Sequence, residues 1–133
     1  MTVLLDACAM IAFLRGEPGA EIVETFLSQD PPVCVAHAIN LCEVFYDFLR
    51  VAGEATAAAA VDDLRAVGLI VREDMDEAFW RQAGRYKARY RVSLADTFAL
   101  FLAERFGAEI LTSDRREFEP LAESGACRVR FIR

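Results

Sequence analysis

Short runs of apolar residues alternate along this chain with longer stretches in which apolar residues recur at helical spacing. The short runs indicate buried strands, and they lie at residues 3–5, 33–35, 69–71, 109–112 and 128–132. The longer stretches predict helices at residues 8–15, 20–29, 37–51, 54–67, 74–91, 93–106 and 114–122. Strands separated by helices are typical of a parallel sheet. The pattern therefore predicts an α/β fold, with one domain over residues 1–133 and a central parallel sheet of four or five strands covered by helices on both faces.

The stretch at residues 74–91 has a clear apolar face. Successive helical residues are rotated by about 100°, so residues three or four apart share a face. On this basis one face collects Met75, Phe79, Ala83, Tyr86 and Tyr90. These five side chains are expected to pack against the core.

The composition narrows the possible functions. Of the 133 residues, 55% are hydrophobic, which suffices for the core of one domain. A net charge of −6 excludes non-specific, charge-driven binding to nucleic acid as the main activity, although it permits a local basic patch. No apolar run approaches the roughly 18 residues of a membrane helix, and the apolar start is interrupted by Asp6, unlike a signal peptide. We therefore expect a cytoplasmic protein that does not enter a membrane.

The four cysteines, Cys8, Cys34, Cys42 and Cys127, form no CxxC pair. Without an export signal they are predicted to be reduced, buried and apolar in character. Cys34 and Cys42 flank the single histidine, His37, and the three residues are conceivable zinc ligands. A structural zinc site needs four ligands, however, so one histidine and irregular spacing disfavour this reading.

Four carboxylates lie in sequence contexts that suggest a functional role. Asp6 and Asp114 each follow a predicted buried strand and precede a helix. Glu43 and Asp96 lie among apolar neighbours near the start of predicted helices. A buried carboxylate is costly unless it is paired, protonated or bound to a metal ion. Oxygen-rich clusters suit Mg²⁺ or Mn²⁺, so one hypothesis is a shared metal site.

A second interpretation treats each carboxylate as a helix cap. Asp6 and Asp114 precede helices, where a carboxylate gains from the free amides and the helix dipole. Ser93-x-x-Asp96 and Asn40-x-x-Glu43 have the spacing of a capping box. The sequence alone leaves both interpretations open.

The motifs also match a known pattern when they are taken in order. A strand ends at Asp6, and it is followed by Asn40-x-x-Glu43, then Ser93-Leu94-Ala95-Asp96, and then Leu111-Thr112-Ser113-Asp114. This ordered set resembles the PIN-domain ribonucleases, and among these it is most similar to the VapC-type toxins of bacterial toxin–antitoxin pairs. The resemblance covers essentially the whole chain.

The resemblance implies a sheet of order 3-2-1-4-5, Mg²⁺-dependent endoribonuclease activity with Mn²⁺ as a plausible substitute, inhibition by a small antitoxin protein, and a homodimer. It assigns the acidic quartet to Asp6, Glu43, Asp96 and Asp114, supported by Thr112, Asn40 and Ser93. The chain departs from the family at Ala7-Cys8, where Ser, Thr or Asn is frequent. This departure is the support for an alternative, a catalytically inactive binding or adaptor module with a PIN-like fold.

Arginines supply candidate contacts for RNA. Arg81, Arg85 and Arg89 recur every four residues and form one stripe on the predicted helix. Arg15 follows the first helix, and Arg115 and Arg116 follow Asp114. The stripe is either a rim that contacts phosphates or a solvated helix flank.

Overall fold

The computed structural model describes all residues, 1–133, and confirms the alternation of strands and helices. The strands are β1 Val3–Leu5, β2 Cys34–His37, β3 Ile70–Arg72, β4 Glu109–Thr112 and β5 Val129–Phe131. The helices are α1 Ala7–Arg15, α2 Ala20–Leu27, α3 Ala38–Ala52, α4 Glu54–Ala66, α5 Glu77–Arg89, α6 Leu94–Phe106 and α7 Arg115–Glu123.

The five strands form one parallel sheet in the order β3-β2-β1-β4-β5, as the family resemblance implied. The central strand, β1, is completely buried, and its side chains alternate between the two faces. Val3 and Leu5 enter one hydrophobic core, whereas Leu4 enters the other. The continuous apolar run is therefore explained by a strand that is covered on both faces.

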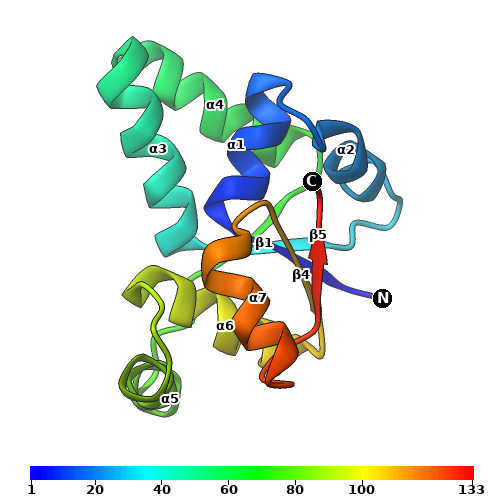
Figure 1. Cartoon of the computed structure of the whole chain (residues 1–133). Helices are drawn as coiled ribbons and strands as arrows, with labels where there is room; N and C mark the ends of the chain where they lie inside the picture. The colour runs from blue at the N-terminus through cyan, green and yellow to red at the C-terminus, as the bar shows by residue number, and fades with distance from the viewer.

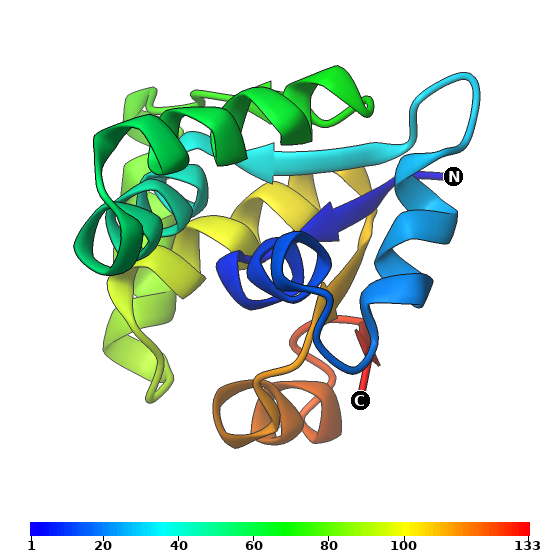
Figure 2. The same cartoon turned by 90° about the horizontal axis from the view of Figure 1, so that it is seen from above.

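Helices supply the other half of each core. The first core receives side chains of α1, α2, α3 and α4, and the second receives those of α5, α6 and α7. Figures 1 and 2 show α1 and α6 on opposite sides of β1. The predicted helix-covered parallel sheet is confirmed.

The sheet has a topological switch point between β1 and β4. From β1 the chain builds the sheet outward to β2 and β3, and then returns to the other side of β1 to form β4 and β5. The connections on either side of such a point diverge, which leaves a crevice at the carboxyl ends of the strands. Asp6 follows β1, and Asp114 lies two residues after β4, so both lie at this crevice.

The largest correction concerns the helix predicted at residues 74–91. The observed helix, α5, begins only at Glu77, and Met75 lies before it with about half of its surface exposed. Asp74 and Asp76 are held in the preceding connection, because Arg105 of α6 binds both carboxylates. Assigning Met75 to the buried face was therefore wrong. Phe79 and Ala83 are buried as expected.

A second correction concerns β2, which continues two residues beyond its predicted end. Pairing with β3 matches Ala36 to Val71 and His37 to Arg72, and this extends the strand. His37 then caps α3: its Nδ1 accepts from the Ile39 amide at 3.0 Å, so Nε2 donates to the Asp74 carbonyl oxygen at 2.9 Å. Both ring nitrogens are used, which removes His37 as a zinc ligand.

The remaining differences are small. The predicted helix at residues 20–29 ends at Leu27, and the other element ends move by one or two residues. All four cysteines are free, as predicted, but Cys42 is exposed and only Cys34 is fully buried. No helix has the length and apolar character required to cross a bilayer.

Candidate metal centre

Asp6 is fixed through both of its carboxylate oxygens. The residue is only 1% exposed and caps α1, since Oδ1 accepts from the Ala9 amide at 2.9 Å. Its Oδ2 accepts from the Thr112 hydroxyl at 2.5 Å. Thr112 is the last residue of β4, the neighbour of β1 in the sheet. The hydrogen bond therefore joins the carboxyl ends of two adjacent strands.

Thr112 also positions the next acid along the chain. The Thr112 hydroxyl oxygen accepts from the Asp114 amide at 2.9 Å while its proton goes to Asp6. Asp114 in turn caps α7, because Oδ1 accepts from the Glu117 amide at 3.1 Å. One buried hydroxyl thus orients the segments that carry Asp6 and Asp114.

Asp96 enters from the start of α6. The Ser93 hydroxyl caps this helix by accepting from the Asp96 amide at 3.1 Å. Carboxylate oxygens of Asp96, Asp114 and Glu117 lie within 4.8 Å of one another, which is close enough for one cation to bind all three. Asp6 lies near enough to add its charge to that of Asp96.

Glu43 reaches the same crevice from α3, and it is positioned by Asn40. The Asn40 Nδ2 group donates to Glu43 Oε2 and to the Ala95 carbonyl oxygen, each at 3.3 Å. Asn40 is fully buried and does not cap α3, a role that His37 performs. The capping interpretation of Asn40 and Glu43 was therefore wrong. For Asp6, Asp114 and Ser93, by contrast, capping and convergence at the crevice occur together.

The clustered carboxylates perturb one another. Burial, together with the charges of Asp114 and Glu43, raises the pKa of Asp6 from 3.8 to about 7, against the lowering effect of its hydrogen bonds to Thr112 and Ala9. Burial and then the contact with Glu117 raise the pKa of Asp96. The pKa of Glu43 is also raised, mainly by burial. A cation bound among these acids would offset the free-energy cost of ionising them.

Two buried polar atoms lack partners next to this cluster. They are Oδ1 of Asn40 and Oε2 of Glu117. Buried oxygens are normally hydrogen-bonded, so each unpaired one requires an explanation. A hydrated cation would provide it, and the oxygen-only donor set fits Mg²⁺ or Mn²⁺.

Glu117 is the acid that the sequence analysis missed. It follows Asp114 by one helical turn, but it stands between Arg116 and Phe118 in a segment rich in charged residues. In that context it resembles an ordinary surface glutamate. The signal that could have found it is its i, i+3 spacing from Asp114, which places both acids on one face of α7.

Cys8 occupies the position where the family often carries a hydroxyl or an amide. Its thiol is half-buried, and its pKa is raised to about 12 by burial and by the charges of Asp6, Asp114 and Asp96. The thiol is therefore neutral at physiological pH and adds no negative charge to the cluster.

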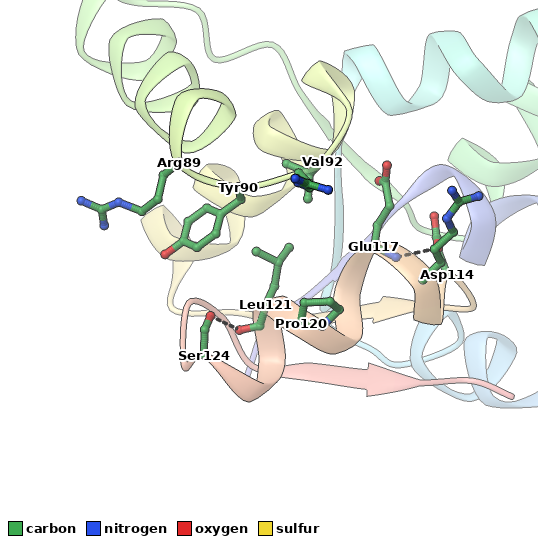
Figure 3. A pocket seen from close by; sticks show the side chains of 10 residues that line it. Arg89, Tyr90, Val92, Asp114, Glu117, Pro120, Leu121 and Ser124 are labelled. Carbon is green, nitrogen blue, oxygen red and sulfur yellow. Dashed lines mark hydrogen bonds between the residues drawn. The ribbon is translucent and has the colours of Figure 1, made fainter.

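A groove of about 800 Å³ leads away from the acids (Figure 3). Asp114 and Glu117 lie at one end, and Arg89, Tyr90 and Ser124 lie at the other. Val92 of the α5–α6 connection faces Leu121 of α7 across it. The groove is thus an open channel to the acids, with cationic residues among its lining.

The predicted RNA-contact arginines fall into two groups. Arg81 is paired with Glu77 at 2.8 Å, Arg85 binds Gln82 at 3.1 Å, and Arg15 is paired with Asp47 at 2.8 Å. Among the four predicted contacts, which include Arg89, only Arg89 lines the groove. Of the two arginines after Asp114, Arg115 is paired with Glu119 at 3.0 Å, whereas Arg116 lines the groove.

The double role of Thr112 gives a first prediction. In Thr112→Val the side chain keeps its shape but loses the hydroxyl, so Asp6 Oδ2 and the Asp114 amide both lose a buried partner. Groups that orient metal ligands are worth about 10- to 100-fold in metal affinity or activity. We expect a loss of metal affinity in this range, measured by Mn²⁺ titration. Thr112→Ser, which retains the hydroxyl, should stay close to the wild type, and equal affinities of all three proteins would contradict the assignment.

The chain is similar to a known protein family and to several solved structures. A family model described as PIN domain matches residues 3–123. A search of curated proteins finds no significant match.

Several solved structures share the fold over nearly the whole chain. The DNA-bound VapBC complex from Salmonella typhimurium aligns with a TM-score of 0.76 and 16% identity, covering 100% of this chain and 99% of that one. A toxin–antitoxin complex from Klebsiella pneumoniae gives 0.73 and 16%, covering 99% and 98%. VapC20 from Mycobacterium tuberculosis, a toxin that cleaves the sarcin–ricin loop, gives 0.71 and 17%, covering 90% and 95%. At these identities the likeness establishes the fold.

Proposed function

Since this chain belongs to the PIN domain family, we propose that it is a VapC-like endoribonuclease that hydrolyses RNA phosphodiester bonds with the help of Mg²⁺ or Mn²⁺. The observation that carries the proposal is the approach of Asp96, Asp114 and Glu117 within 4.8 Å of one another. The raised pKa of Asp6 and the unpartnered oxygens of Asn40 and Glu117 support it, because a cation among these groups would offset the cost of ionising Asp6 and would give the two oxygens a partner.

Each side chain receives a role from its position. The cation would be held by Asp96, Asp114 and Glu117. Asp6 would add a further carboxylate beside it, in an orientation fixed by its hydrogen bonds with Ala9 and Thr112. When bound, the cation would lower the pKa of water and neutralise charge on the phosphate. Glu43, which accepts a hydrogen bond from Asn40, would accept a proton from the attacking water. Ser93 fixes the start of α6 and with it Asp96.

The remaining parts of the proposal follow from the family. The complexes from Salmonella and Klebsiella contain an antitoxin, and we extend this to the present chain as control by a small antitoxin protein. We also propose a homodimer and a cytoplasmic location. The alternative, an inactive adaptor with the same fold, is supported by Ala7 and Cys8, which cannot orient a ligand as Ser, Thr or Asn can.

The direct test uses the purified chain with structured and unstructured RNA in the presence of Mg²⁺, Mn²⁺ or a chelator. Endonucleolytic products that require the metal are expected. Metal ions should also raise the melting temperature, since a ligand that binds only the folded state stabilises it. A metal-induced shift without cleavage would favour the adaptor, and absence of both would refute the metal site.

Glu117→Gln tests the acid that the sequence analysis missed. The substitution keeps the size of the side chain but removes one charge from the group of three. We expect the Mn²⁺ affinity to fall about tenfold, since one charge-assisted contact to the ion is weakened by at least the value of an ordinary hydrogen bond. Glu119→Gln is the matched control, because Glu119 lies on the same helix but is paired with Arg115 at the surface. Equal Mn²⁺ affinity of the two variants would remove Glu117 from the site.

A further inference from the structure

Most arginines of this protein bind a partner within the chain, and four do not. Neither an ion pair nor a side-chain hydrogen bond is formed by Arg65, Arg89, Arg91 or Arg116. Three of these four, Arg89, Arg91 and Arg116, line the groove that opens at the acids. The chain carries a net charge of −6, so the lack of partners does not reflect a shortage of acids.

The position of Arg116 is the most informative. It lies in the first turn of α7, where the positive end of the helix dipole disfavours a cation. Its neighbours Asp114 and Glu117 form no ion pair with it, and they belong to the cluster of acids. An anion in the groove would give this exposed guanidinium a partner.

Tyr90 adds an aromatic surface to the same groove. It follows the last residue of α5, is half-buried, and lies at the end away from the acids, near Ser124 (Figure 3). Its ring centroid lies 6.0 Å from that of Tyr86, with the two rings tilted by 33°. Arginines that track a backbone, together with an aromatic ring on which a base can stack, are the combination by which proteins bind single-stranded nucleic acid.

We infer that Arg89, Arg91 and Arg116 bind phosphates of a single-stranded RNA segment that runs from the acids along α7, with one base stacked on Tyr90. This inference rests on the proposed function, whose site it extends. A duplex hides its base faces, so stacking on Tyr90 requires an unpaired stretch. The helix stripe of Arg81 and Arg85 is not part of this surface, because those side chains bind Glu77 and Gln82.

The test measures binding of a labelled oligouridylate by fluorescence anisotropy in the presence of a chelator. No hydrolysis then occurs, and contacts through a metal ion contribute nothing. The triple variant Arg89→Gln, Arg91→Gln, Arg116→Gln removes the proposed contacts. On single strands each phosphate contact contributes about 0.7 to the slope of log K against log[salt], so the slope should fall by about 2, and affinity at roughly 0.1 M salt should fall about 100-fold.

The chain offers a matched control in Arg65→Gln. Like Arg89, Arg65 is exposed, unpaired and in the last turn of a helix, but it lies on α4, outside the groove. Its replacement should leave both slope and affinity unchanged. Tyr90→Leu should weaken binding of the oligouridylate about tenfold and leave duplex RNA unaffected.

The outcomes separate this inference from the proposed function. If the triple variant binds as the wild type does while the wild type still cleaves RNA with Mn²⁺, the groove assignment is wrong and the metal site stands. If the wild type neither cleaves RNA nor responds to Mn²⁺, but the triple variant loses RNA affinity, the metal site is wrong and the groove assignment stands. If an oligoglutamate peptide binds with the same arginine dependence and the oligouridylate does not bind, the groove receives an acidic protein segment, and the inference is overturned.

Discussion

Replacing Asp96 by Asn is expected to abolish metal-dependent RNA hydrolysis, with a loss of about 10³-fold or more. The side chain keeps its shape and the Ser93 hydroxyl still accepts from the amide of residue 96, so the fold should be retained. What disappears is one of the three charges that lie within 4.8 Å of one another. Charge stabilisation by a catalytic metal amounts to several kcal/mol, which corresponds to this loss in rate.

The same variant should be more stable than the wild type without metal. Burial and the contact with Glu117 raise the pKa of Asp96 to about 9, so at about pH 8 the folded state must bind a proton that the unfolded state does not hold, which costs stability. At about pH 8 the melting temperature of the metal-free variant should rise by a few degrees, and the response to Mn²⁺ should largely vanish. Loss of activity together with a lower melting temperature would instead indicate damage to the fold.

Asp62→Asn provides the control for both measurements. Asp62 is an exposed residue of α4 and forms no ion pair with any arginine of the chain. Its replacement changes the net charge by the same amount but leaves the crevice untouched. Hydrolysis, melting temperature and the Mn²⁺ response should all match the wild type.

The stability of the metal-free protein is expected to fall as the pH rises from about 5 to about 8. Between its unfolded pKa of 3.8 and its folded pKa of about 7, Asp6 binds more protons in the folded state than in the unfolded state. The free energy of unfolding therefore decreases with pH through this window, by at most about 4 kcal/mol from Asp6. Asp74 and Asp76, whose pKa values are lowered by their bonds to Arg72 and Arg105, act in the opposite direction only at lower pH.

A divalent metal ion should counteract this fall in stability with rising pH. Metal binding requires ionised carboxylates, so the gain in melting temperature on adding Mn²⁺ should be larger at about pH 8 than at about pH 5. Denaturant titrations at several pH values, with and without Mn²⁺, measure both effects. Asp6→Asn isolates the contribution of Asp6, and its metal-free stability should depend less on pH. A wild type and variant with the same pH dependence would contradict the raised pKa of Asp6.

The sequence was sufficient for the fold wherever the determining physics is local. The apolar run at Val3–Leu5 specified a strand buried on both faces, and Gly107 ended α6 in the left-handed conformation that favours glycine. Asp6 and Asp114 could be placed at strand ends because Asp6 directly follows such a run and Asp114 follows one after a single residue. Where a distant partner decides, the prediction failed: Met75 lies outside α5 because Arg105 holds the connection that precedes the helix.

The sequence by itself determined the order of strands and helices, the strand ends where acids stand, and the stripe of Arg81, Arg85 and Arg89 on one helix. Only the tertiary structure decided that Glu117 joins Asp96 and Asp114, that Asn40 positions Glu43 rather than capping a helix, and which arginines face the groove. Secondary structure follows from neighbours a few residues apart, whereas the convergence of side chains depends on how far-separated segments pack. A cap, a surface glutamate and a metal ligand have the same local sequence, and they differ only in what the fold brings beside them.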